Sequence, residues 1–456
     1  MSDLIAAVAT APGRAAIGVL RLSGPGAIAA AASVFAPLRG PALALRPDRA
    51  LVYGTLRDRE GHVIDQALAT VSRAPHSYTG EETAELQCHG APAVLALGLD
   101  ALFAAGARQA GPGEFTKRAF LNGKLDLTQA EAVADLIDAE TAQAAIHAAG
   151  QLTGALSRRV EDIYDGLAMV LAHFHVVLDY PDEDLDPFRT ETITAALDGA
   201  ESALDALLVS YRRGRHLTGG IPCAIVGRPN AGKSSLLNAL LGYDRAIVTE
   251  VPGTTRDTVE ERCTLGGTLL RLIDTAGLRE SADAVERIGV ARSRAALQDA
   301  LLVLLVLDGA SPLTEEDEAV MAEAEQAPHC ICVVTKSDLP LSVDPDALRA
   351  RFPRTCVVSS VTGAGLDRLE ALVAAQFPPG TDEGAGLLLT NARQAEAAGR
   401  ALESLRGART GLADGFPPDA VLTDVEAALA ALGGLTGKNL REEVVGRIFS
   451  RFCVGK

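Results

Sequence analysis

GRPNAGKSS, residues 227–235, decides the fold of the central part of this 456-residue chain. The stretch has the form G-x-x-x-x-G-K-S and stands between TGGIPCAIV, typical of a buried strand, and SLLNALLG, which has a helical pattern. Backbone N–H groups of such a loop cradle phosphates at a helix N-terminus, while Lys233 reaches the outer phosphates and the Ser234 hydroxyl holds Mg²⁺. A chance glycine-rich turn is improbable with strand and helix both in place. The sequence therefore predicts a phosphate-binding loop.

Two loops further along the chain suit the metal ion and a terminal phosphate. GTTRD (253–257) lies at the distance expected of a switch segment, and Thr255 there can complete the Mg²⁺ shell. DTAG (274–277) follows the strand-like TLLRLID. Asp274 can therefore hold Mg²⁺ through a water molecule, and the Gly277 N–H can sense a γ-phosphate.

Two more loops suit a guanine base. TKSD (335–338) follows the strand-like CICVV, which places Asp338 where a carboxylate can pair with two guanine N–H groups. SSVTGAG (359–365) supplies a final loop that faces the base. Five such segments in this order resemble a Ras-like P-loop GTPase. The resemblance implies GTP or GDP contacts from Asn230, Ala231, Gly232, Lys233, Ser234, Ser235, Thr249, Glu250, Val251, Pro252, Gly253, Thr254, Thr255, Asp274, Thr275, Ala276, Gly277, Thr335, Lys336, Ser337 and Asp338.

Two positions depart from the Ras-like pattern. A glutamine that orients the attacking water usually follows DTAG, but Leu278 stands here and has no polar group. Something else must supply both the positioning of water and the positive charge. Thr335 replaces the usual asparagine of the guanine motif, and so lacks the amide that contacts the base and braces the P-loop. We expect a modest loss of nucleotide affinity with guanine preference retained, and tighter GDP binding by a Thr335→Asn variant.

Length and composition indicate a soluble, cytoplasmic protein of two or three domains. The chain is 48% apolar and 22% charged. Its net charge of −17 excludes bulk attraction to nucleic acid, so an RNA needs a local patch or a partner. Seven cysteines without a C-x-x-C pair argue against a disulfide framework or a zinc site. No apolar run approaches the roughly 20 residues of a membrane span, and the N-terminus is a poor signal peptide.

The pattern of apolar residues divides the chain into four segments. IGVLRLSG, RALVYGTL, HVIDQALATVS and TAELQCHG read as strands, with a helix in APAVLALGLDALFAAGA. Helical patterns begin near Leu127, where Thr128 and Glu131 suggest a capping box. Strands and helices then alternate, which favours a parallel sheet, before helices return at 391–450. We expect the two helical blocks, 127–213 and 391–450, to pack together. The predicted domains are 1–119 (N-terminal α+β), 120–216 (helical, first part), 217–380 (inserted α/β GTPase module) and 381–456 (helical, second part).

Segments outside the nucleotide module resemble the MnmE (TrmE) family of tRNA-modification GTPases. They are PGRAAIGVLRLSG, SYTGEETAELQCHG, PGEFTKRAFLNGKLDLTQAEAVADLIDA, DYPDEDLD and the terminal GRIFSRFCVGK. The resemblance implies a protein that works with the flavoprotein MnmG, as a homodimer within a heterotetramer. Together they add an aminomethyl or carboxymethylaminomethyl group to the wobble uridine of certain tRNAs. A 5-formyl- or methylenetetrahydrofolate would bind the N-terminal domain, whose fold is similar to that of folate-binding aminomethyltransferases.

The same resemblance accounts for the missing glutamine. It implies a K⁺ ion beside the phosphates, held by the Asn230 side chain and by carbonyls near Thr249, Val251 and Thr254. Asn230 alone is better explained as a turn residue, but together with GTTRD and Leu278 the cation interpretation is favoured. Glu286 matches the family's acidic residue that orients the catalytic water. Catalysis would then depend on Asn230, Lys233 and Glu286, with Ser234 and Thr255 on Mg²⁺.

The resemblance also implies a folate site made by Arg21, Glu85, Lys124 and the terminal Lys456. Each of the first three has an ordinary structural reading from sequence alone. Cys453 is no prenylation site, because Lys456 does not fit the last position of such a box. Cys453 is expected beside the one-carbon unit, either as a nucleophile or as a packed thiol. Two other functions stay open, a ribosome-assembly switch and a folate-dependent transferase that its GTPase only regulates.

Overall fold

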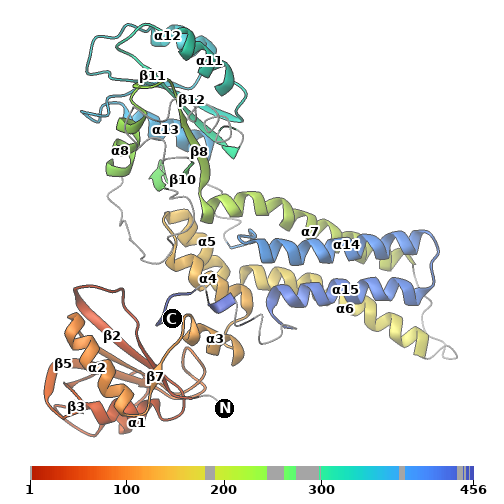
Figure 1. Cartoon of the computed structure of the whole chain (residues 1–456). Coiled ribbons are helices and arrows are strands. Elements are labelled where there is room, and N and C mark those ends of the chain that lie inside the picture. The colour runs from red at the N-terminus through yellow and green to blue at the C-terminus, as the bar shows by residue number, and fades with distance from the viewer. Residues whose placement is uncertain are drawn as a thin grey trace. The chain divides into compact units, whose positions relative to one another are not determined.

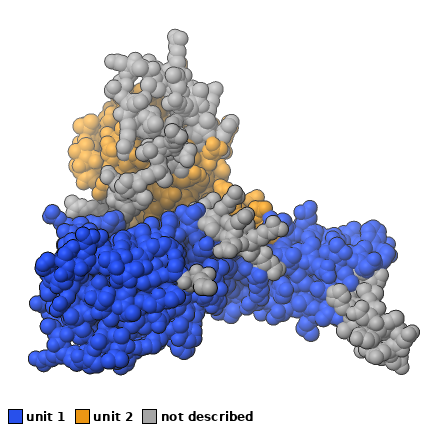
Figure 2. Space-filling model, turned by 60° about the horizontal axis from the view of Figure 1, so that its bottom comes forward, with its two compact units in different colours: residues 1–134, 151–200, 400–456 blue, residues 135–150, 201–399 orange. Residues whose placement is uncertain are grey.

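The computed structural model describes residues 3–179, 190–243, 261–273, 297, 299–378, 386–438, 445, 448–450 and 452–455. These residues form two compact units (Figures 1 and 2). Unit 1 consists of residues 1–134, 151–200 and 400–456, and unit 2 of residues 135–150 and 201–399. No described helix is both long enough and apolar enough to cross a membrane.

Unit 1 contains a seven-stranded sheet in the order β3-β4-β5-β6-β2-β1-β7. Leu20, Leu22 and Leu86 are buried beneath the helices on one face, whereas Arg21 and Glu85 alternate with them and lie on the other. The four predicted strands and the predicted helix are confirmed, and further short elements join them. The bounds are β1 (Ile5–Val8), β2 (Ala15–Ser23), α1 (Ala27–Val34), β3 (Phe35–Pro37), η1 (Leu43–Leu45), β4 (Val52–Arg57), β5 (Val63–Ser72), β6 (Thr83–Gly90), α2 (Pro92–Ala104) and β7 (Arg108–Gln109).

Long helices from the two helical blocks run side by side (Figure 1). Helix α6 packs against α15, and within unit 1 the ion pair between Arg409 and Asp198, at 3.6 Å, connects α14 with α7. The expected packing of the two helical blocks is therefore confirmed for these pairs. The bounds are α3 (Glu114–Leu121), α4 (Leu127–Ile137), α5 (Ala142–Leu152), α6 (Ala155–Asp179), α7 (Thr190–Gly219), α14 (Ala392–Ala413) and α15 (Pro418–Thr436).

The capping box of α4 lies two residues earlier than predicted. Asp126 Oδ1 accepts the Gln129 N–H at 2.9 Å, and Gln129 Oε1 accepts the Asp126 N–H at 3.0 Å. The Thr128 hydroxyl is buried and lies 2.8 Å from that of Ser157. The prediction of Thr128 and Glu131 was wrong because an aspartate two residues earlier offers a carboxylate to the same free N–H groups.

Unit 2 contains a six-stranded sheet in the order β13-β12-β11-β8-β10-β9. All neighbours are parallel except β9 and β10, which confirms the predicted parallel sheet. Every residue of β8 and of β11 is buried, as expected of central strands covered on both faces. The bounds are β8 (Ile221–Val226), α8 (Lys233–Tyr243), β9 (Glu261–Leu265), β10 (Thr268–Ile273), β11 (Leu302–Asp308), α11 (Glu315–Ala324), β12 (His329–Thr335), α12 (Pro345–Arg351), β13 (Thr355–Val357) and α13 (Leu366–Gln376).

Residues 386–390, here called the return segment, precede α14 and are fixed to helices of the same unit. His147 Nδ1 accepts the Gly386 N–H at 3.0 Å, so its Nε2–H can donate to the Leu388 carbonyl at 3.2 Å. The Leu389 carbonyl oxygen lies 2.0 Å from the position that a Cβ on Gly214 would take. The return segment therefore lies directly on the backbone of α7.

Candidate functional site

The phosphate-binding loop joins β8 to α8, as predicted. Asn230 and Gly232 adopt φ angles of 62° and 98°, which turn the chain back toward the helix N-terminus. Lys233 Nζ donates to the carbonyls of Gly227 and Arg228, both at 2.8 Å. Burial lowers the pKa of Lys233. The loop thus places the lysine beside the backbone N–H groups of a helix start, which is an arrangement suited to a phosphate.

Thr335 lies against this loop. Its side chain is buried, and its hydroxyl lies 2.6 Å from the Ala231 carbonyl oxygen and 3.1 Å from that of Leu307. We expected the P-loop to lose a brace where threonine replaces asparagine. That expectation was wrong in part, since the hydroxyl reaches the P-loop backbone directly. The effect on contacts to the base stays a prediction.

Asp338 is held in place by the loop that follows β13. Its Oδ1 accepts the Ser359 hydroxyl at 2.6 Å, while the Ser359 oxygen accepts the N–H groups of Val361 and Thr362 at 3.3 and 3.2 Å. The two predicted base-facing loops, 335–338 and 359–365, therefore meet, and the hydrogen bond between them fixes the carboxylate predicted to bind guanine.

Three charged residues that we did not single out from the sequence surround these loops. Asp308 ends β11 and accepts Lys336 Nζ at 2.8 Å. The Arg228 guanidinium lies 3.7 Å from Asp308 and 3.1 Å from Asp317. Burial opposes ionisation of Asp308, but hydrogen bonds from Lys336 and the Ala310 N–H outweigh it and lower its pKa. An aspartate at the end of a fully apolar strand is the signal that could have identified this residue.

Part of the predicted nucleotide and metal site lies outside the described residues. This part comprises the K⁺ carbonyls, the second Mg²⁺ ligand, the γ-phosphate loop and the water-orienting glutamate. The residues are Thr249, Glu250, Val251, Pro252, Gly253, Thr254, Thr255, Asp274, Thr275, Ala276, Gly277 and Glu286. Lys456 of the predicted folate site also lies outside them.

A cavity of about 200 Å³ opens on the N-terminal sheet, and two predicted folate residues line it. Arg21 Nε donates to Glu85 Oε1 at 2.8 Å across β2 and β6, and the guanidinium lies 5.8 Å from the Phe115 ring centre. Their side chains are 29% and 31% exposed, so the pair is accessible to a ligand that could take the place of one partner. The lining residues are Arg21, Tyr78, Thr79, Thr83, Glu85 and Phe115.

The carboxyl-terminal tail reaches the same cavity. The Cys453 carbonyl accepts the Gly113 N–H at 3.1 Å, Val454 pairs with Pro112, and the Gly455 carbonyl lies 3.5 Å from Arg21 Nη1. The Cys453 side chain is exposed. Gly455 has a φ of 97°, and a Cβ there would lie 2.2 Å from the Val8 carbonyl oxygen. Only glycine at position 455 therefore allows the tail to lie this close to the backbone of Val8.

Lys124 stands close to the cavity without lining it. A Cβ on Gly80 would lie 3.2 Å from the Lys124 side chain, and Gly80 follows the lining residue Thr79. The structure therefore brings Arg21, Glu85 and the tail together and places Lys124 beside them.

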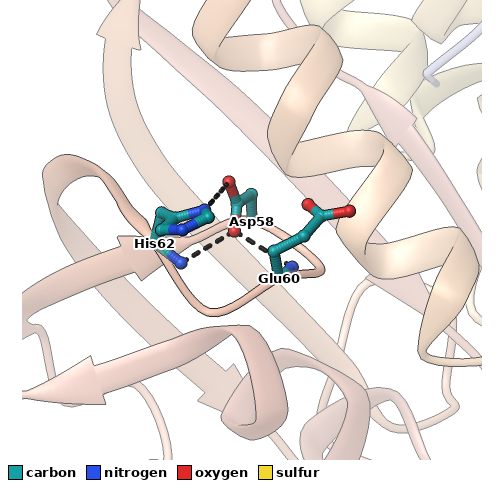
Figure 3. Close-up of side chains that lie close together, drawn as sticks. All are labelled: Asp58, Glu60 and His62. Carbon is teal, nitrogen blue, oxygen red and sulfur yellow. Dashed lines mark hydrogen bonds and ion pairs between the residues drawn. The ribbon is translucent and has the colours of Figure 1, made fainter.

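Asp58, Glu60 and His62 form another polar cluster, shown in Figure 3. Asp58 Oδ1 accepts the N–H groups of Glu60 and His62 at 3.1 and 2.8 Å, and its Oδ2 lies 3.1 Å from His62 Nδ1. These bonds close the turn between β4 and β5. The cluster is therefore explained as a turn.

Comparison with known proteins covers the whole chain. The family described as "MnmE helical domain" matches residues 127–453, and "GTP-binding protein TrmE N-terminus" matches residues 4–124. The tRNA modification GTPase MnmE of Roseiflexus sp. (strain RS-1) is 45% identical over 469 residues, covering 100% of this chain and 99% of the relative. That of Symbiobacterium thermophilum is also 45% identical, over 456 residues, with the same coverage. The solved G domain of the T. maritima FeoB iron transporter is 29% identical over 34% of this chain and 97% of that chain, with a TM-score of 0.26. The chain belongs to the MnmE (TrmE) family of tRNA modification GTPases.

Proposed function

We propose that this GTPase of tRNA modification hydrolyses GTP in a K⁺-dependent reaction. Working with the flavoprotein MnmG, it would modify the wobble uridine of certain tRNAs with a one-carbon unit from tetrahydrofolate. Family membership already shows a GTPase that acts in tRNA modification. We further propose that the chain forms a homodimer and a heterotetramer with MnmG, and that it contacts tRNA mainly through that complex. A net charge of −17 supports the last point, because the chain lacks bulk attraction for RNA.

One observation supports K⁺ dependence most directly. Asn230 is an exposed amide held at a φ of 62° in the phosphate-binding loop. Amide and carbonyl oxygens suit a hard cation, and Ser234 at the start of α8 offers a hydroxyl to Mg²⁺. When bound, the cations add positive charge beside the transferred phosphoryl group. Lys233 would bind the outer phosphates. Glu286, which matches the acidic residue of the family, would orient the attacking water, a task that the apolar Leu278 cannot perform.

The cavity beside Arg21 supports folate binding. A guanidinium can bind the carboxylates of folate, and Glu85 can accept the N–H donors of a pterin. The volume of about 200 Å³ lies below the roughly 300–1,000 Å³ of whole-ligand pockets. The cavity would therefore hold one end of the folate, with the tail and Lys124 at its margin.

The experiment is GTP turnover in K⁺ and in Na⁺ at equal ionic strength, with and without the flavoprotein. We expect turnover to be higher in K⁺ by roughly tenfold or more, because a bound cation would stabilise the charge that develops on the phosphoryl group. Loss of one preorganised hydrogen-bond donor at such charge already costs about 10²–10³ in kcat. Asn230→Ala should abolish the difference, whereas Asn238→Ala, an exposed asparagine on α8, should keep it. Equal rates in both salts would remove the K⁺ mechanism.

The proposed role in modification of the wobble uridine has its own test. We expect tRNA from cells that lack this chain to lose the modified uridine, and normal modification in such cells would overturn that role.

A further inference from the structure

Strand β11 lies between the strands that carry the phosphate-binding loop and the guanine-recognition loop. It pairs with β8, where Leu305 stands opposite Val226 at the entrance to the phosphate-binding loop. It also pairs with β12, where Asp308 stands opposite Thr335, the first residue of the guanine motif. The end of β11 is therefore the point in the sheet that is adjacent to both loops.

Asp308 occupies this point with a buried carboxylate that faces a cation from each loop. Its side chain is 8% exposed, and its Oδ2 lies 2.8 Å from Lys336 Nζ of the guanine motif. The same oxygen lies 3.7 Å from Arg228 Nη2 of the phosphate-binding loop. Arg228 Nε also lies 3.1 Å from Oδ2 of the buried Asp317, an ion pair without a hydrogen bond that places the guanidinium against the start of α11.

The contacts of Asp308 affect the shape of the guanine motif as well as the stability of the unit, because Lys336 has an unfavourable backbone conformation. Its φ is 60°, a region that side-chain-bearing residues rarely adopt. The ion pair with Asp308 opposes relaxation of that conformation. Without the carboxylate, Lys336 and Arg228 would face each other as partly buried like charges, with 36% and 20% of their side chains exposed.

We propose that Asp308 is a positioning residue that couples the phosphate-binding loop to the guanine-recognition loop. The two loops thereby bind the two ends of one nucleotide cooperatively. The inference rests on the proposed nucleotide site, and it concerns a residue that need not touch the nucleotide. Coupling of this kind is reciprocal and typically changes affinity by 5–150-fold.

The test compares a whole nucleotide with its two parts. Fluorescent GDP is titrated into the full chain and into an Asp308→Asn variant, and guanosine and pyrophosphate are then measured as competitors. We expect Asp308→Asn to weaken GDP binding by about tenfold while changing the affinity of each part by less than about twofold. Asp346→Asn is the matched control, because Asp346 pairs only with Arg349 among the contacts described, on the exposed surface of α12.

The outcomes separate this inference from the proposed nucleotide site. If the unaltered chain fails to bind GDP, the proposed site is wrong. If it binds GDP and Asp308→Asn binds equally well, the coupling is overturned. The coupling is also overturned if guanosine or pyrophosphate binding weakens by the same factor as GDP binding. That result would mean that the substitution damages the site for one part of the nucleotide. Should Asp308→Asn fail to fold, Arg228→Gln removes the other end of the bridge, and unchanged GDP affinity in that variant overturns the coupling as well.

Discussion

At the scale of the residue, the Thr335 hydroxyl connects the guanine motif to the backbone of the phosphate-binding loop. Thr335→Val keeps the shape of the side chain but leaves the carbonyls of Ala231 and Leu307 without its hydroxyl. Loss of one such hydrogen bond costs about 1 kcal/mol. We therefore expect GDP to bind roughly fivefold more weakly in equilibrium titrations.

Thr355→Val is the matched control for this variant. Thr355 is also buried, and its hydroxyl donates to the Phe352 carbonyl at 2.6 Å, at the start of β13. Its removal should lower stability by a similar amount without changing GDP affinity. If both variants bind GDP equally well, the contact from Thr335 to the P-loop has no part in binding. The tighter binding expected of Thr335→Asn stays a separate prediction.

The sequence predicts the residues inside each motif better than the residues that connect motifs. Lys233 and Asp338 follow from spacing, because a glycine-rich loop or a short turn fixes its own neighbours. The bridge from Arg228 through Asp308 to Lys336 depends on the order of the strands. Asp308 is 80 positions from Arg228 and 28 positions from Lys336, and the strand order brings the three together. No local sequence pattern predicts that order.

At the scale of the element, the return segment predicts a response to pH. Burial lowers the pKa of His147 below 6.5, so the folded chain resists a proton that the unfolded chain accepts. Stability therefore falls as pH drops below the unfolded value and is unaffected above it. Protonation would also turn Nδ1 into a donor facing the Gly386 N–H. We expect hydrogen-exchange protection of the Gly386 and Leu389 amides to fall between pH 7.5 and 5.5.

A glutamine at position 147 can keep one donor and one acceptor without titrating. His147→Gln should make the protection of the return segment nearly independent of pH, once intrinsic exchange rates are removed. His76→Gln, which removes an exposed histidine from unit 1, should leave the pH dependence unchanged. An identical pH response in all three chains would show that His147 does not control this segment.

Long periodic elements were predictable, whereas short ones were not. Strands β2 and β5 and helix α2 follow from alternation and helical spacing. Strand β7 has two residues, both exposed, and forms because it pairs with β1. Helix α1, AIAAAASV, has apolar or small residues all round, so no periodic face marks it.

At the scale of the whole molecule, the folate proposal depends on two distant parts of unit 1. Removal of residues 453–456 deletes the pairing of Val454 with Pro112 and the contact of Gly455 with Arg21. We expect this truncation to weaken binding of 5-formyltetrahydrofolate roughly tenfold by calorimetry, as loss of a charge-assisted contact and its neighbours implies. Arg21→Gln should weaken it at least as much.

Arg59→Gln is the control, because Arg59 is exposed on the same unit and pairs with Glu60 and Asp100. Folate binding by that variant should equal binding by the unaltered chain. Cys453→Ser then decides between the two readings of the thiol. Normal tRNA modification by this variant with the partner would exclude thiol chemistry, and full folate binding without modification would support it.

The attachment of the tail to the N-terminal sheet also bears on the order in which the molecule is assembled on the ribosome. Arg21 and Gly455 are 434 positions apart, and residues 400–456 are translated after all of unit 2. Domains generally fold as units while synthesis proceeds. Unit 2 can thus be complete before Pro112 has Val454 to pair with, so the proposed site beside Arg21 is assembled only after residue 455 has been translated.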